Sequence, residues 1–134
     1  LGPARLEPGD LGLGRLGFLA ERLGTLASFR SGAVGLPGPD REIDGEMLEL
    51  EAGDRVPINT VSIGNPHCVI PVDELSPDLP RRYGPVIETH ALFPQRIYVQ
   101  FLQVIDRRRI RIEIWERGAG YTLASGSSSS AAAV

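Results

Sequence analysis

Alternation of apolar and polar residues is the feature of this chain that most constrains its fold. The stretch from Met47 to Val72 alternates on both sides of Ala52-Gly53-Asp54, and this pattern is typical of strands that bury one face. A glycine-containing turn between two such runs predicts a β-hairpin. We therefore expect three strands, near residues 46–51, 56–63 and 67–72.

A second pair of β runs lies nearer the C-terminus. RIYVQFLQV (96–104) and RIRIEIWE (109–116) are joined at Asp106-Arg107-Arg108, which again predicts a hairpin. The chain then ends in a glycine-flanked turn and the start of an alanine-rich helix. Hairpins with helices packed against them predict an α+β domain built on an antiparallel sheet.

Two further segments are candidates for helices. Residues 16–29 have apolar spacing compatible with a short helix. In the segment 73–92, Ser76 is a candidate cap for a short helix, which we expect Pro80 and Pro85 to interrupt.

Length and charge limit the class of protein. A chain of 134 residues fits a single domain, 1–134, with one core. The net charge of −3 argues against nucleic acid or an anionic membrane as a partner. No apolar run approaches the roughly 20 residues that span a bilayer, and the N-terminus lacks the pattern of a signal peptide. We expect a cytoplasmic protein with a small-molecule partner.

The basic and sulfur-containing residues narrow the chemistry further. All 14 basic residues are arginine, so the chain cannot form a lysine Schiff base with a carbonyl substrate or pyridoxal phosphate. His67, His90 and the single cysteine, Cys68, are too few for a convincing zinc site. One cysteine also excludes an internal disulfide. We therefore expect no metal and no cofactor.

The segment VSIGNPHCVI (61–70) is the first candidate for a binding site. Asn65 and His67 stand at the junction of two β runs, where they could contact a small polar ligand. The alternative is a tight turn in which Asn65 caps its own backbone. Cys68 lies inside an apolar run and is expected to pack as a buried apolar group rather than act as a nucleophile.

The segment from Glu116 to Val134 is the second candidate. Ser125 and Gly126 precede a serine and alanine run that predicts a helix, and a helix N-terminus presents free N–H groups that can hold a carboxylate or phosphate. Two alternatives stay open. Ser125 could simply cap the helix, or the serine run could be a flexible linker in a purely structural domain.

Four motifs together resemble the second half of the diaminopimelate epimerase family, the cofactor-independent amino-acid epimerases and racemases. They are GNPHCV (64–69), GPVIETHALFP (84–94), YVQF (98–101) and WERGAGYTLASG (115–126). The resemblance covers roughly residues 45–134 in the family's order and spacing. It implies two pseudo-symmetric α+β lobes with the active site between them. On this basis we expect the chain to be a C-terminal lobe that is truncated within its central helix and lacks its N-terminal lobe.

The resemblance also implies a reaction and a set of residue roles. The family inverts the α-carbon of an amino acid by two-base proton transfer, with one cysteine from each lobe. By motif position, the substrate carboxylate would be held by the backbone N–H groups of Gly126 and Ser127 and its ammonium by Glu116. Asn65 and Arg117 would reach the distal part of the substrate, and His67 would support the cleft wall.

Two residues depart from the family pattern. Ser125 occupies the position of the second catalytic cysteine, and a serine hydroxyl is a far weaker acid than a thiol, whose ordinary pKa is about 8.5. Tyr98 stands where the family usually has an asparagine that contacts the substrate. We expect no turnover by the isolated chain, and a catalytically degenerate domain that binds a small carboxylate is the alternative. The identity of the amino acid, the origin of Ser125 and the formation of a homodimer stay open.

Overall fold

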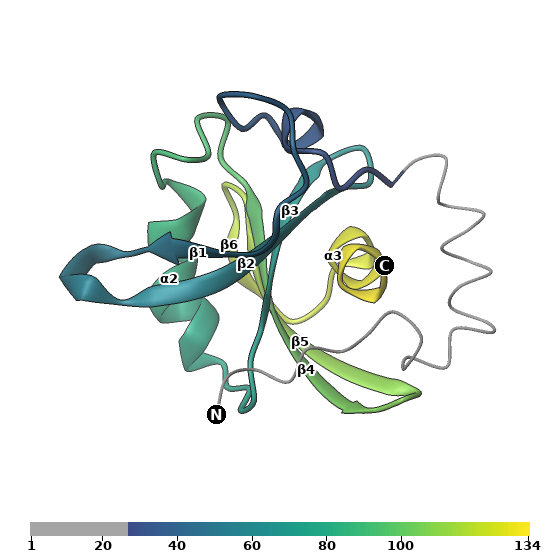
Figure 1. Cartoon of the computed structure of the whole chain (residues 1–134). Coiled ribbons are helices and arrows are strands. Elements are labelled where there is room, and N and C mark those ends of the chain that lie inside the picture. The colour runs from purple at the N-terminus through teal and green to yellow at the C-terminus, as the bar shows by residue number, and fades with distance from the viewer. Residues whose placement is uncertain (1–26) are drawn as a thin grey trace.

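A six-stranded sheet with an α-helix on each face forms the part of the chain that the computed structural model describes, residues 27–134 (Figure 1). The strands are β1 (Asp44–Glu49), β2 (Arg55–Ser62), β3 (Pro66–Pro71), β4 (Tyr98–Asp106), β5 (Arg109–Glu116) and β6 (Gly120–Thr122). The helices are α2 (Asp78–Glu88) and α3 (Gly126–Ala133), with short 3-10 turns η1 (Ser31–Val34) and η2 (Glu51–Gly53). The expected α+β architecture is confirmed.

The sheet is mixed, so the expectation of a wholly antiparallel sheet is wrong. The strand order is β1-β2-β3-β4-β5-β6, and every neighbouring pair is antiparallel except β3 and β4. The physical reason is the connection between these two strands. It carries α2 across one face of the sheet and returns the chain in its original direction, as a parallel pair requires.

Helix α2 continues through both of its prolines, contrary to the expectation that they interrupt it. Pro80 lies in the first turn, where a backbone N–H has no intrahelical partner to lose. Pro85 lies inside the helix, but the helix is held there by its apolar face, in which Ile87 is fully buried against the sheet. The expected cap by the Ser76 side chain is also wrong, because no side chain caps α2. Ser76 contributes only its backbone carbonyl, which accepts a hydrogen bond from the Leu79 N–H.

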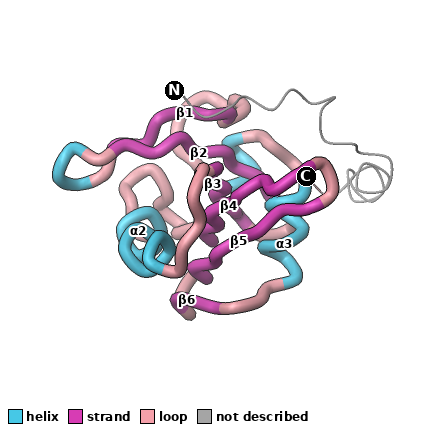
Figure 2. The backbone as a smooth tube through the Cα atoms, turned by 90° about the horizontal axis from the view of Figure 1, so that it is seen from below, coloured by secondary structure: helices cyan, strands magenta, loops and turns pink. Residues whose placement is uncertain are grey.

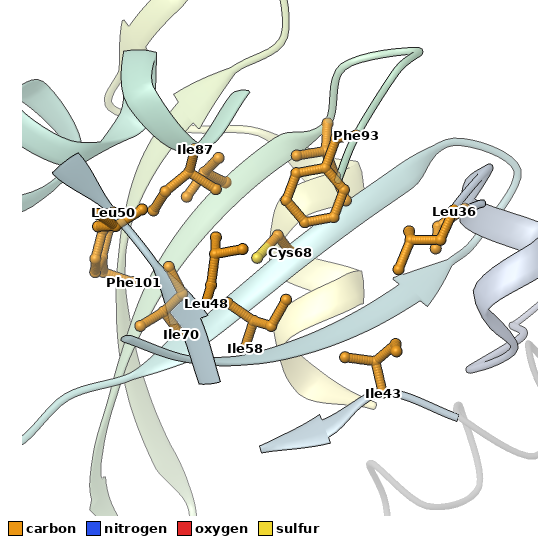
Figure 3. Packing of buried hydrophobic residues seen from close by; sticks show 13 residues of the cluster. Leu36, Ile43, Leu48, Leu50, Ile58, Cys68, Ile70, Ile87, Phe93 and Phe101 are labelled. Atoms are coloured by element: carbon orange, nitrogen blue, oxygen red, sulfur yellow. The ribbon is translucent and has the colours of Figure 1, made fainter. Parts of the chain in front are cut away.

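Two layers of side chains separate the sheet from its helices, and α2 and α3 lie on opposite faces (Figure 2). The larger layer lies on the α2 side and includes Cys68, as expected; burial raises the pKa of its thiol. Figure 3 shows this cluster, which comprises Val34, Leu36, Ile43, Leu48, Leu50, Ile58, Cys68, Ile70, Ile87, Phe93, Ile97, Val99 and Phe101. Among residues 27–134, the α3 side holds a small apolar cluster around Val61, Val69 and Ala131, and polar side chains are buried on that face as well.

The helix expected over residues 16–29 lies almost entirely outside the described residues. Its last three residues are described and are not helical, since Ser28 forms an antiparallel bridge with Ser62 of β2. Within residues 27–134, no helix is both long enough and apolar enough to cross a membrane.

Candidate functional site

The N-terminus of α3 is ordered by a serine cap. Ser125 has extended backbone angles, and its Oγ accepts a hydrogen bond of 3.2 Å from the Ser128 N–H. Its carbonyl accepts the Ser129 N–H at 3.0 Å. The helix shows that the flexible-linker interpretation is wrong, and the capping role considered for Ser125 is confirmed.

The amides at the start of α3 are the groups that could hold an anion. Among the described residues, no group accepts a hydrogen bond from the backbone N–H of Gly126 or Ser127. The cap on Ser128 therefore leaves two donors at the positive end of the helix dipole. They can bind one carboxylate, although nothing in the described residues marks its position, so this site stays a prediction.

His67 is the centre of a buried polar cluster under α3. It lies on β3 and is fully buried; its Nε2 lies 3.0 Å from Asn65 Oδ1 and its Nδ1 lies 3.3 Å from Gln100 Oε1. The side chain of Asn65 therefore contacts His67, whereas the alternative interpretation had it capping its own backbone. The contact fixes the orientation of Asn65 at the end of β3.

The protonation state of His67 follows from this burial. The pKa of His67 is lowered from 6.5 to about 4, chiefly because the buried ring loses solvent. The hydrogen bond to Gln100 partly opposes this effect, and the positive charge of Arg117 adds to it. At neutral pH the ring is therefore neutral and carries a single N–H. It can donate to only one of its two amide neighbours.

Gln100 extends the cluster from the sheet to α3. Its Nε2 donates to Ser128 Oγ at 2.9 Å, and both side chains are fully buried. Neither Gln100 nor Ser128 was predicted from the sequence as a site residue. A signal exists for Gln100, because it is a polar residue within the apolar strand run YVQF, but no pattern in the sequence assigns it a partner.

Tyr98 contacts both His67 and Arg117. Its ring stacks on the imidazole with centroids 5.1 Å apart, since His67 and Tyr98 are paired across the parallel strands β3 and β4. The guanidinium carbon of Arg117 lies 5.2 Å from the centroid of the Tyr98 ring, and Arg117 also donates to the Gln95 carbonyl at 3.4 Å. A cation held over an aromatic face in this way has a restricted orientation.

Glu116 ends β5, and Arg117 begins the turn between β5 and β6. Glu116 pairs with Gly120 across the turn, in which Gly118 has a φ of 76° that glycine adopts readily. The structure thus joins Asn65, His67, Tyr98 and Arg117 by direct contacts. Within residues 27–134, no hydrogen bond or ion pair joins Glu116 to the start of α3.

Comparison with known proteins assigns the family. The model of the family described as diaminopimelate epimerase matches residues 59–134, which is more than half of the chain. The chain belongs to the diaminopimelate epimerase family. All of the residues placed above in the candidate site lie within the matched range.

Individual diaminopimelate epimerases support the same assignment. The chain is 53% identical over 106 residues to diaminopimelate epimerase 2 of Nostoc sp., covering 79% of this chain and 37% of that protein. It is 41% identical over 134 residues to diaminopimelate epimerase of Stutzerimonas stutzeri, covering 100% of this chain and 40% of that protein. Diaminopimelate epimerase of Pelotomaculum thermopropionicum is 45% identical over 101 residues, 75% of this chain and 36% of that protein. The chain therefore spans two fifths or less of the length of these relatives.

Proposed function

We propose that this chain is one lobe of a cofactor-independent amino-acid epimerase, with diaminopimelate or a related amino acid as substrate. The family assignment supports the reaction class. The observation that carries the proposal is the pair of amides, Gly126 and Ser127, at the start of an ordered helix, for which residues 27–134 supply no hydrogen-bond acceptor. A substrate carboxylate is the group that such amides favour.

The proposed mechanism uses these amides to stabilise developing charge. Removing the α-proton leaves a carbanion whose charge spreads onto the adjacent carboxylate, so donors fixed at that carboxylate stabilise the transition state. Inversion also requires two acid/base groups, one on each face of the carbon. In this scheme Gly126 and Ser127 bind the carboxylate, and Glu116 binds the ammonium group.

The remaining residues would select the substrate. Asn65 and Arg117 would contact the distal end of a long amino acid, and Tyr98 would limit the space beside them. His67 is buried and neutral, so it would orient Asn65 rather than transfer a proton. A guanidinium held over an aromatic ring favours a ligand with a second carboxylate, which diaminopimelate has.

Ser125 occupies the position where the second acid/base group would stand. Its hydroxyl accepts the Ser128 N–H as a helix cap, and no basic side chain of the described residues lies within hydrogen-bond distance to activate it. We therefore expect this lobe to bind substrate but to transfer no proton from its own face.

A second candidate function follows from the same observation. A serine that serves as a helix cap favours a degenerate epimerase-like domain that retains the carboxylate site and only binds its ligand. The two candidates differ in one measurable property, which is exchange of the α-proton.

The test is exchange of the α-proton of diaminopimelate in deuterated water, followed by NMR with the full-length gene product. We expect binding with little exchange for the wild type, and faster exchange for Ser125→Cys. Ser129→Cys is the matched control, because Ser129 is an exposed serine one turn further along α3. Saturable binding without exchange in any variant supports the degenerate domain, and absence of both binding and exchange rejects both candidates.

A further inference from the structure

Glu88, the last residue of α2, is a buried carboxylate that bonds to the end of β5. It is 6% exposed. Its Oε2 accepts the indole N–H of Trp115 at 2.8 Å, and its Oε1 accepts the backbone N–H of Gly118 at 2.7 Å. Burying a carboxylate is costly unless it is well paired, so these two short hydrogen bonds require an explanation.

The two donors enclose the two residues proposed to contact substrate. Trp115 precedes Glu116, and Gly118 follows Arg117. A single carboxylate therefore fixes the chain on both sides of Glu116 and Arg117. Two-point attachment restricts both the position and the rotation of a turn, which a single hydrogen bond does not.

The indole of Trp115 is fixed by packing as well. A Cβ atom built on Gly84 of α2 would lie 2.4 Å from Cγ of Trp115, so the ring occupies the space that a side chain would need. Helix α2 thus holds Trp115 through close contact at Gly84 and through hydrogen bonding at Glu88, one helical turn later. The end of β5 has little freedom relative to α2.

Arg96 connects the same carboxylate to the loop that Arg117 contacts. Its NH1 lies 3.6 Å from Glu88 Oε1. Arg96 is the one non-glycine residue with positive φ among those described, at 60°, and such a conformation persists only where its surroundings hold it. The preceding residue, Gln95, supplies the carbonyl that accepts from Arg117.

We propose that Glu88 is a positioning residue for substrate binding, which holds the Trp115–Gly118 turn so that Glu116 and Arg117 face the ligand. This inference rests on the proposed function. Glu88 itself is buried on the α2 side and does not touch the substrate. Its effect is transmitted through Trp115 and Gly118.

Two variants separate geometry from charge. Glu88→Gln keeps the length of the side chain but places an NH2 group against one of two N–H donors. Glu88→Asp keeps the charge near Arg96 but is one methylene shorter, so it cannot reach both donors. Glu74→Gln is the matched control, because Glu74 is exposed and lies in the loop before α2.

The first measurement needs no ligand. Hydrogen exchange of the Trp115 indole N–H and the Gly118 amide is followed by NMR in the full-length gene product. Both Glu88 variants should speed exchange at these two groups, while Glu74→Gln leaves them unchanged. Unaltered exchange and chemical shifts at both groups in Glu88→Gln would overturn the proposal.

The second measurement compares two ligands by calorimetry. Diaminopimelate has a second carboxylate for Arg117, and alanine does not. We expect each Glu88 variant to weaken diaminopimelate binding about tenfold, the effect of losing one hydrogen bond to a charged group. Alanine binding should weaken less, because alanine meets Glu116 through its ammonium group but has no second carboxylate for Arg117. A merely structural role would weaken both ligands equally.

The outcomes distinguish this inference from the proposed function. If the wild type binds neither ligand, the proposed function fails, and the role of the turn fails with it. If the wild type binds diaminopimelate and Glu88→Asp binds it as tightly, the proposed function stands and two-point positioning by Glu88 is wrong.

Discussion

Gln100 donates its side-chain amide to the hydroxyl of Ser128 across 2.9 Å, and neither residue has any exposed surface. One residue lies within β4 and the other in the first turn of α3. This bond therefore ties the helix that carries the candidate carboxylate site to the sheet beneath it. Because the apolar cluster on this face is small, the polar link should account for much of the stability of the contact.

Replacing Gln100 tests that link. Gln100→Leu removes two hydrogen bonds and leaves the Ser128 hydroxyl and a nitrogen of His67 buried without a partner. Each of the two groups costs about 1 to 3 kcal/mol, so we expect the free energy of unfolding to fall by about 2 to 6 kcal/mol. Urea denaturation measures this. Gln103→Leu is the control, since Gln103 loses only an exposed hydrogen bond to Asp73 and should cost less than about 1 kcal/mol.

Gly84→Ala tests the close contact between α2 and Trp115. Helix propensity alone predicts that alanine stabilises a helix by about 1 kcal/mol relative to glycine. The new Cβ would lie 2.4 Å from Trp115 Cγ, so we expect the variant instead to be destabilised by about 1 to 3 kcal/mol. Gly126→Ala is the comparison in α3, where a Cβ would meet nothing within 4 Å. Equal stability of Gly84→Ala and wild type would show that the contact is loose.

The buried ring of His67 predicts a dependence of stability on pH. Above pH 6.5 the ring is neutral in both the folded and the unfolded chain. As the pH falls from 6.5 to about 4, the unfolded chain takes up a proton that the folded chain does not. The free energy of unfolding should therefore decrease across this window, by up to about 3 kcal/mol, and the loss should level off below it.

Two measurements check this dependence. An NMR titration should give His67 a pKa near 4, and a value near 6.5 would contradict the buried, neutral ring. Urea denaturation at several pH values should show a shallower loss for His67→Gln than for the wild type.

Ser125→Ala tests the cap of α3. Removing the hydroxyl leaves the Ser128 N–H without its acceptor, and loss of such a cap costs about 1 kcal/mol. Ser125→Asn retains a capping side chain and should stay close to the wild type. Ser130→Ala is a further control, because the Ser130 hydroxyl only donates to a carbonyl one turn earlier. Thermal unfolding of the three variants gives the ranking, and a Ser125→Ala protein as stable as Ser125→Asn would show that the cap contributes nothing.

The strands could be predicted closely from the sequence because alternation is a local property. The expected strand at 56–63 is observed as Arg55–Ser62, and the one at 67–72 as Pro66–Pro71. The parallel pairing of β3 with β4 could not be predicted in the same way. Strand direction depends on where the connection through α2 lies, which is a tertiary property that no short stretch of sequence contains.

The candidate site was predictable in part for the same reason. Asn65, His67 and Arg117 belong to motifs that resemble a known family, so they could be expected in one site, and the structure connects them through direct contacts with one another or with Tyr98. Gln100, Ser128 and Glu88 act through partners that lie 27 to 33 residues away in the sequence. Burial of a polar side chain becomes interpretable only when the partner is known.

The parallel junction between β3 and β4 has a consequence for folding kinetics. The hairpins β2–β3 and β4–β5 on either side of the junction close short loops. The junction itself pairs two strands that are separated by the whole of α2. Closing this longer loop costs more entropy, so it is the slow step of folding. His67 and Gln100 lie on opposite sides of that junction. A partly folded chain with both hairpins formed would therefore still lack the polar cluster, and ligand-binding competence should arise together with the final long-range contacts.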